Sequence, residues 1–117
     1  MSASSNSQTR YKLVYRVLPS HLSATKDAIF AVGGGVYADG KYIKVCFEIP
    51  GFGQFLPVAE KGAVPHTGKV GVLERTEEVL VHILCTGEEV TRKAVEALKR
   101  THPYEEVSYE VYKLEDF

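Results

Sequence analysis

The sequence predicts an α+β domain with a four-stranded antiparallel sheet. Four stretches have the side-chain pattern of strands, with alternate residues on two faces, at residues 11–18, 42–49, 77–85 and 107–114. Two further stretches, residues 22–32 and 90–101, carry apolar residues at helical spacing. The resulting order is strand, helix, strand, strand, helix, strand, which is the ferredoxin-like, or split βαβ, arrangement with both helices on one face of the sheet.

Local signals set the ends of the predicted helices. Ser20 is the expected N-cap of the first helix, and the three glycines at residues 33–35 should end it, because glycine adopts left-handed conformations without a Cβ penalty. Thr86 and Glu89 have the spacing of a capping box at the start of the second helix. Pro103 lacks an amide donor and disfavours a helical residue before it, so the second helix should end just before this proline.

The size and composition of the chain restrict its class. Its 117 residues suffice for one domain, predicted at residues 11–117, and the mostly polar residues 1–10 are expected to form a disordered leader. A formal net charge of -1 without a run of Lys and Arg argues against nucleic-acid binding. No stretch has the length of a membrane span or the pattern of a signal peptide, so no membrane contact is expected.

Several patterns of known chemistry are absent from the sequence. Cys46 and Cys85 lack the spacing of a disulfide framework or a zinc site, which favours a cytoplasmic protein, with the nucleus as an alternative. The glycines at residues 33–35 follow a helix, so they are not a dinucleotide fingerprint, and residues 62–69 miss the spacing of a phosphate-binding loop. No nucleophile elbow or HExxH motif is present.

Two segments are candidates for a functional site. Residues 50–72 contain five glycines and are expected to form a long loop, which in a compact domain is usually functional or an oligomer contact. Residues 102–106, His-Pro-Tyr-Glu-Glu, gather an imidazole, a phenol and two carboxylates at the turn from the second helix to the last strand. The alternative is that this histidine only satisfies a backbone carbonyl and that the glutamates are solvated.

The same segments resemble those of a known family. The matching stretches are Tyr-Lys-Leu-Val at residues 11–14, Gly-Phe-Gly-Gln-Phe-Leu-Pro at 51–57, Gly-Lys-Val-Gly-Val-Leu-Glu at 68–74, and His-Pro-Tyr-Glu-Glu-Val-Ser-Tyr-Glu-Val-Tyr-Lys-Leu at 102–114. With them the chain resembles the Nif-three-like proteins, and specifically the PII/CutA-like domain that many members carry as an insertion.

The resemblance implies a fold and an assembly but no hydrolase centre. Relatives of the PII and CutA type form trimers with sites in the clefts between subunits, so a trimer is favoured here over a dimer. The dinuclear-metal ligands of the family belong to the segments that flank this domain. The second strand of the family often has the sequence Tyr-Asp-His-Cys-Ser-Phe, whereas Ile43, Lys44 and Val45 follow Tyr42 here, so any function of the Asp and His is not expected.

Three functional hypotheses follow from these observations. The first is a non-enzymatic oligomeric binding or regulatory module that requires no cofactor and holds a small ligand, a metal ion or a protein partner. It is motivated by apolar positions on the sheet face without helices, which self-association would cover: Val14, Leu80 and Leu84. The second is a small hydrolase-like enzyme with His102 as acid/base and Glu105 or Glu106 as its orienting carboxylate. The third is a protein-interaction adaptor.

The candidate ligand-binding residues come from both segments, which are expected to meet in space. They are Gly51, Gly53, Gln54, Phe55, His102, Tyr104, Glu105 and Glu106. The alternative is that Phe55 and Tyr104 only pack against each other to hold the loop. His66 and His102, with Glu105, are also candidates for a copper or zinc site, since imidazole and carboxylate suit these ions.

Overall fold

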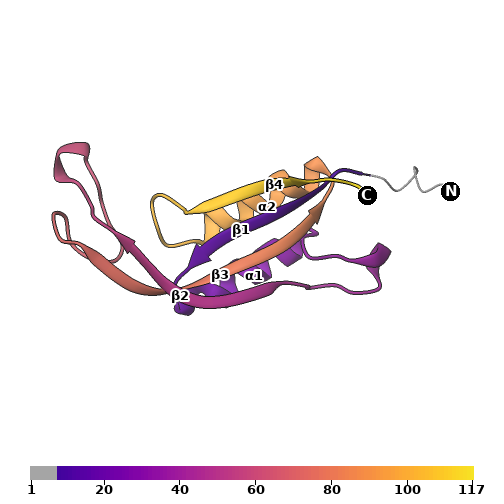
Figure 1. Cartoon of the computed structure of the whole chain (residues 1–117), viewed down its shortest axis with the longest axis horizontal. Coiled ribbons are helices and arrows are strands. Elements are labelled where there is room, and N and C mark those ends of the chain that lie inside the picture. The colour runs from indigo at the N-terminus through magenta and orange to yellow at the C-terminus, as the bar shows by residue number, and fades with distance from the viewer. Residues whose placement is uncertain (1–7) are drawn as a thin grey trace.

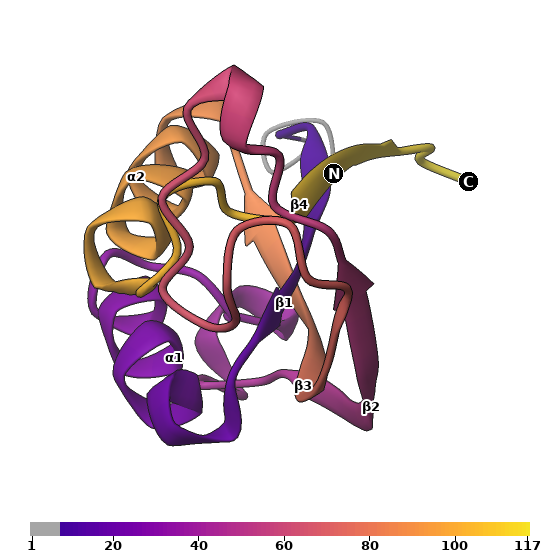
Figure 2. The same ribbon diagram turned by 90° about the vertical axis from the view of Figure 1, so that its left-hand side faces the viewer.

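The computed structural model describes residues 8–117, which fold into a four-stranded antiparallel sheet with two helices (Figure 1). Along the chain the elements are β1 (Arg10–Val17), α1 (Leu22–Ala31), β2 (Phe47–Phe55), β3 (Glu74–Thr86), α2 (Glu88–Thr101) and β4 (Tyr109–Leu114). The strands lie in the order β2-β3-β1-β4, with every neighbouring pair antiparallel. Both helices pack on one face of the sheet (Figure 2). The predicted ferredoxin-like α+β fold is confirmed.

The folded part begins before the predicted boundary at residue 11. Residues 1–7 of the predicted leader lie outside the part of the chain that the structure describes. Arg10 already pairs with Thr86 and Leu114, and the Thr9 carbonyl accepts a hydrogen bond of 2.8 Å from the Gly87 amide. Backbone pairing, to which the polar composition of this segment gives no clue, therefore fixes residues 9 and 10.

The core lies between the sheet and its two helices. Alternate side chains of β1 and β3 face the helices and form one fully buried cluster with residues of α1 and α2: Leu13, Tyr15, Val17, Ile29, Val81, Ile83, Cys85, Ala94, Ala97 and Leu98. Within it the Tyr15 hydroxyl donates a hydrogen bond of 3.0 Å to Thr25 Oγ1, and burial raises the pKa of Tyr15 to about 12. Burial of one large apolar side chain contributes about 1.5–3 kcal/mol, so this cluster holds both helices on the same face.

The position of β2 differs from the sequence-based expectation of residues 42–49, because the strand runs from Phe47 to Phe55. The apolar residues of its alternating pattern also do not face the helices. Phe47 and Ile49 are exposed on the face without helices, whereas Cys46 packs against the core. Alternation gives the period of a strand but not the identity of its buried face, and a shift of one residue exchanges the two faces.

Residues 51–55 extend β2 into the segment that is expected to be a loop. They pair with residues 74–78, so β3 begins at Glu74 rather than at Glu77. Because β1 pairs with β3 only as far as Val79, these two strand ends project from the sheet as a two-stranded arm (Figure 1). Glycine is unfavourable inside strands, which is why composition predicts a loop here. The loop itself spans residues 56–73.

The helix C-termini follow the sequence signals. α1 ends before the three glycines, of which Gly33 and Gly35 have φ values of 107° and 75°. α2 ends at Thr101, just before the His-Pro pair. Left-handed glycines and the missing proline amide therefore stop the two helices as predicted.

The N-terminal caps are not those predicted. No side chain caps α1, and Ser20 lies instead in a one-turn 3-10 helix that precedes it. The N-cap of α2 is Gly87 with a φ of 91°, and Thr86 and Glu89 do not form a capping box. Thr86 is the last residue of β3 and pairs with Arg10, so the sheet keeps its backbone extended and away from the helix terminus.

The sheet face without helices, here called the open face, is apolar at other positions than those predicted. Val14 and Leu84 are each only 4% exposed, and Leu80 is partly buried, so neighbouring side chains already cover them. The exposed apolar side chains on this face are instead Phe47, Ile49 and Tyr112, at 64%, 44% and 54%. Among the described residues, neither helix has the length and hydropathy needed to cross a membrane.

Gly35 is a position at which an added side chain should be costly. Its amide donates a hydrogen bond of 2.7 Å to the Leu84 carbonyl, and its carbonyl accepts one of 2.9 Å from the Val45 amide. At its φ of +75°, an added Cβ would lie 2.7 Å from the Val45 carbonyl oxygen. We predict that Gly35→Ala lowers the free energy of unfolding by about 3 kcal/mol, measured by urea denaturation, because strain and a clash act together.

Gly40→Ala is the matched control for this substitution. Gly40 also has a positive φ, of +96°, but an added Cβ would meet nothing within 4 Å. Its replacement should cost only the backbone strain, about 1 kcal/mol. Equal losses for the two variants would show that the close approach at Gly35 does not matter.

Candidate functional site

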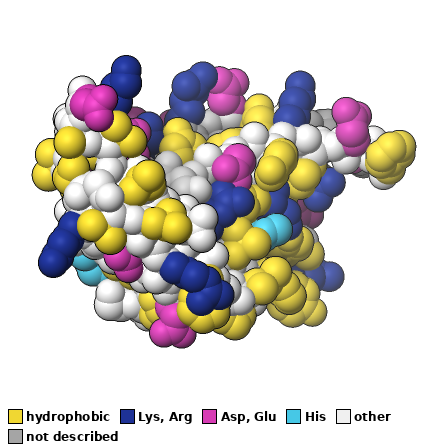
Figure 3. Space-filling view, turned by 60° about the vertical axis from the view of Figure 1, so that its left-hand side comes forward, with side chains coloured by type: hydrophobic (Ala, Val, Ile, Leu, Met, Phe, Trp, Pro, Cys, Tyr) yellow, Lys and Arg dark blue, Asp and Glu magenta, His cyan; other side chains and the backbone are white. Residues whose placement is uncertain are grey.

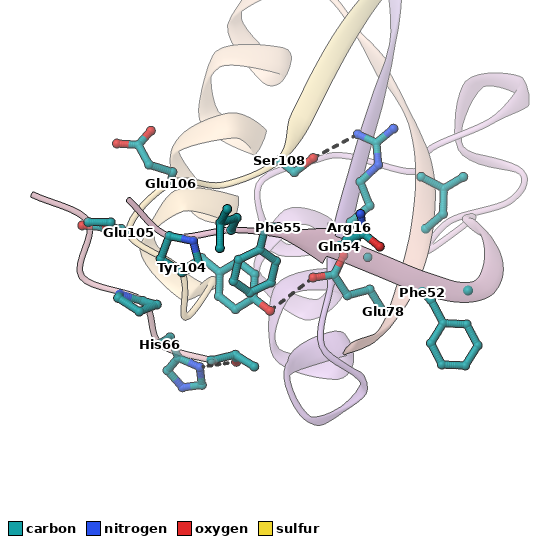
Figure 4. A pocket seen from close by; sticks show the side chains of 18 of the residues that line it. Arg16, Phe52, Gln54, Phe55, His66, Glu78, Tyr104, Glu105, Glu106 and Ser108 are labelled. Carbon is teal, nitrogen blue, oxygen red and sulfur yellow. Dashed lines mark hydrogen bonds between the residues drawn. The ribbon is translucent and has the colours of Figure 1, made fainter. Parts of the chain in front are cut away.

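A cavity of about 710 Å³ opens between the arm, the loop at residues 56–73 and the corner that joins α2 to β4 (Figure 4). We call this cavity the cleft and residues 102–108 the corner. Apolar and aromatic residues of the arm and the loop form much of its wall: Phe52, Phe55, Leu56, Pro57 and Val58. Its ionisable lining residues are Arg16, His66, Glu78, Tyr104, Glu105 and Glu106.

The structure brings most of the candidate binding residues to this cleft. From β2 it brings Gly51, Gly53, Gln54 and Phe55, and from the corner Tyr104, Glu105 and Glu106. The two segments therefore meet at one place, as expected from the sequence. His102 belongs to the same corner but does not line the cleft. A role of these residues in binding stays a prediction.

Gly53 makes room for a carboxylate of the neighbouring strand. A Cβ at this position would collide with the carboxyl group of Glu78. That carboxylate accepts a hydrogen bond of 3.2 Å from the Tyr104 hydroxyl (Figure 4). Burial raises the pKa of Tyr104, and the negative charges of Glu78 and Glu74 raise it further. The second glycine of the arm thus allows an acid of β3 to reach the corner.

Tyr104 is the centre of an aromatic cluster in the cleft. The centroid of its ring lies 6.0 Å from that of Phe55 and 6.0 Å from that of His66. The His102 ring lies behind it at 5.1 Å. Inclined ring pairs at these distances are favourable. Phe55 and Tyr104 therefore pack together, as the alternative interpretation holds, and they still line an open cleft.

Glu105 ties the loop to the corner. Its carboxylate accepts a hydrogen bond of 2.7 Å from the Val64 amide. Hydrogen bonds to an ionised acceptor are stronger than neutral ones, so this contact holds one wall of the cleft in place. Glu106 lines the cleft as well and is exposed.

His102 has a structural role in the corner. It is only 7% exposed, its Nε2 lies 2.7 Å from the Arg16 carbonyl, and its Nδ1 lies 3.1 Å from the Tyr104 amide. A carbonyl needs a donor and an amide needs an acceptor, so the ring is the neutral tautomer with its proton on Nε2. Burial lowers the pKa of His102, and the nearby His21 and His66 act in the same direction. The alternative in which this histidine satisfies a carbonyl is the arrangement observed.

Arg16 and Glu78 are ionisable lining residues that sequence analysis missed. Arg16 Nη1 lies 2.6 Å from Glu110 Oε1 and 3.4 Å from Ser108 Oγ, so β4 holds its guanidinium. Glu78 stands in β3 opposite Gly51. Other charged residues stand near both of them in their strands, so the sequence does not single them out, and strand pairing is needed to place their side chains in the cleft.

The geometry does not support the predicted copper or zinc site of His66 and His102. Both ring nitrogens of His102 already hydrogen-bond to the backbone, which leaves no lone pair for a metal. Glu105, the third candidate ligand, binds the Val64 amide. Within residues 8–117, no three His, Cys, Asp or Glu side chains lie close enough together to hold a metal ion.

The sheet and the arm define a PII/CutA-like module. The periplasmic divalent cation tolerance protein CutA from Archaeoglobus fulgidus superposes with a TM-score of 0.61 at 11% identity, over 92% of this chain and 86% of that one. The B. subtilis GlnK–ATP complex gives 0.58 at 14% identity, over 91% and 82% of the two chains. At these identities the likeness establishes the fold alone.

More similar proteins bear on the resemblance to a known family. A Bacillus cereus protein related to NIF3 matches with a TM-score of 0.75 at 30% identity, over 93% of this chain and 26% of that chain. The GTP cyclohydrolase 1 type 2 homologue of Halalkalibacterium halodurans is 36% identical over 112 residues, which are 96% of this chain and 29% of the relative. No protein-family profile matches the chain. The resemblance to the Nif-three-like family is confirmed, and the chain spans less than a third of the curated relatives it matches.

The lowered pKa of His102 predicts a pH-dependent stability. The unfolded chain binds a proton on this residue near pH 6.5, while the folded chain resists protonation. The contribution of His102 to the free energy of unfolding is therefore complete above that pH and is lost as the pH falls from about 6.5 towards the lower folded-state pKa. We expect urea denaturation between about pH 7 and pH 5 to show this decline.

The variant His102→Gln tests the origin of this decline. A glutamine amide can still donate to the Arg16 carbonyl but does not titrate, so the decline should become shallower. His82→Gln makes the same replacement at a histidine on the open face and is the control. Identical slopes for all three proteins would assign the pH dependence to other groups.

Proposed function

We propose that the chain is a non-enzymatic binding module that holds a small ligand in the cleft and associates with copies of itself through the open face. The volume of the cleft supports the proposal that it binds a small ligand. Sites for small molecules typically measure about 300–1,000 Å³ and combine apolar walls with a few polar groups. The cleft, at about 710 Å³, has this size and this mixture.

The arrangement of the corner supports binding over the small hydrolase-like alternative. That alternative needs His102 as a proton donor and acceptor beside Glu105. The histidine instead uses both nitrogens on the backbone, and the glutamate is bound to the Val64 amide. A general base must reach the proton it removes, and a ring held in this way does not reach the cleft.

A substitution that fills the cleft tests ligand binding. Gly51 lines the cleft, its φ is not in the left-handed region, and an added Cβ would meet nothing within 4 Å. Gly51→Phe should therefore fold normally while it occupies the space of a ligand. Pro50→Phe adds the same ring to the neighbouring, exposed position of β2, outside the lining, and is the control.

The readout is a thermal-shift screen of nucleotides, divalent metals and common metabolites, because a ligand that binds only the folded state raises its stability. We expect at least one compound to stabilise the parent chain and Pro50→Phe but not Gly51→Phe. If no stabilising compound loses its effect in Gly51→Phe, the cleft is not a ligand site.

The exposed apolar side chains of the open face support self-association. Phe47 and Ile49 lie side by side in register with β3, and Tyr112 stands on β4 across the same face. Figure 3 shows hydrophobic side chains exposed over much of one side of the molecule. Apolar surface of this kind, set among polar residues, is typical of protein contacts. A trimer remains our favoured assembly over a dimer.

Light scattering measures the oligomeric state. The protein concentration should be tens of micromolar, an ordinary range for weak association. We expect the parent chain to be an oligomer and Phe47→Glu to be a monomer, since burying an unpaired carboxylate in the contact opposes association. Leu73→Glu removes an equally exposed apolar side chain, 60% against 64%, from the loop and should leave the oligomer intact. A monomeric parent chain would contradict this part of the proposal.

A further inference from the structure

The charges that line the cleft are unbalanced. Three acidic residues line it, Glu78, Glu105 and Glu106, against one arginine, Arg16. The guanidinium is already paired with Glu110 at 2.6 Å. Among residues 8–117, no Lys or Arg forms an ion pair with any of the three lining carboxylates. The cleft therefore carries negative charge that the chain itself leaves uncompensated.

Glu78 is the carboxylate best placed to bind a cationic group. It is partly buried, its Oε2 accepts the Tyr104 hydroxyl at 3.2 Å, and its other oxygen lies over Gly53. A carboxylate removed from water normally has a cationic partner, because the hydrogen bond of one phenol compensates only part of its lost hydration. Burial is the main cause that raises the pKa of Tyr104, and the negative charges of Glu78 and Glu74 add to it.

The walls next to this carboxylate suit an apolar or aromatic body. The rings of Phe55 and Tyr104 lie 6.0 Å apart beside Glu78, and Leu56 and Val58 are half exposed at the edge of the cleft, at 52% and 42%. Faces of aromatic rings attract cations as well as apolar groups. An apolar molecule with a positive end would bury these surfaces and neutralise the carboxylate at the same time.

We propose that the cleft selects a small organic cation, an amine or guanidinium on an apolar or aromatic body, with its charged end at Glu78 and Tyr104. This inference rests on the proposed function and names the class of its ligand. A phosphate or carboxylate ligand lacks a free cationic partner here, and no residue of either helix lines the cleft to offer an N-terminus. A metal ion lacks a cluster of three donors in the described residues.

Three compounds of matched shape test the charge preference: phenethylamine, phenethyl alcohol and hydrocinnamate. Their affinities are measured by NMR titration of the parent chain, followed at the amides of Gly53 and Tyr104. We expect the amine to bind at least about tenfold more tightly than the alcohol, and added salt to weaken only the amine. Equal affinities of amine and alcohol, or tighter binding of hydrocinnamate, would overturn the proposal.

Two substitutions in β3 locate the charge that is responsible. Glu78→Gln keeps the shape of the side chain and should weaken amine binding about tenfold while leaving the alcohol unchanged. Glu77→Gln removes the same charge from the next residue, which is exposed, points to the other face of the strand and does not line the cleft. Unchanged amine affinity in Glu78→Gln would contradict the assignment of the charged end.

The thermal-shift screen separates failure of this inference from failure of the proposed function. If a compound loses its effect in Gly51→Phe but is neutral or anionic, the cleft is a ligand site and the preference for cations is wrong. If no compound loses its effect in Gly51→Phe, the binding function itself is wrong, and the inference falls with it. If the compounds that lose their effect in Gly51→Phe are cations, and Glu78→Gln weakens their binding, the proposed function and the preference for cations are both supported.

Discussion

The register of β2 on β3 is the constraint on which the cleft depends. Gly51 lies opposite Glu78, and directly opposed residues of an antiparallel pair share a face. The register therefore sets the glycines of the arm, Phe55 and Glu78 on the open face, where Arg16 also lies. A slip of one residue would turn the open-face side chains of β2, Phe55 among them, to the helix side. The cleft is in this sense a product of strand pairing rather than of loop conformation.

Much of the fold could be predicted because its signals are local. The apolar alternation of β1, the left-handed glycines after α1 and the proline after α2 each act within a few residues, and all three are confirmed. The placement of β2 could not be predicted, because glycines 51 and 53 mark a loop by composition while pairing with β3 makes them a strand. The missed cap of α2 has the same cause, since Thr86 is held in the sheet by its partner Arg10.

The candidate site was also predictable only where its signals are local. The His-Pro-Tyr-Glu-Glu stretch and the glycine segment are recognisable in the sequence, and they do meet. What each side chain does there depends on partners far along the chain: His102 on the Arg16 carbonyl, Glu105 on the Val64 amide. Sequence separation of 86 and 41 residues puts these contacts beyond any local pattern. The most conspicuous residue of the motif therefore supports the corner, while the less conspicuous Glu78 faces the cleft.

The packing of Glu78 over Gly53 has a consequence for sequence change in related chains. The space of a side chain at residue 53 is occupied by a carboxyl group that belongs to residue 78, so the two positions share one volume. A larger residue at 53 requires that the Glu78 carboxyl group moves away or that residue 78 becomes shorter, and either change takes the acceptor from the Tyr104 hydroxyl. Drift at these positions is therefore coupled, and a side chain gained on the arm displaces the acid of the cleft.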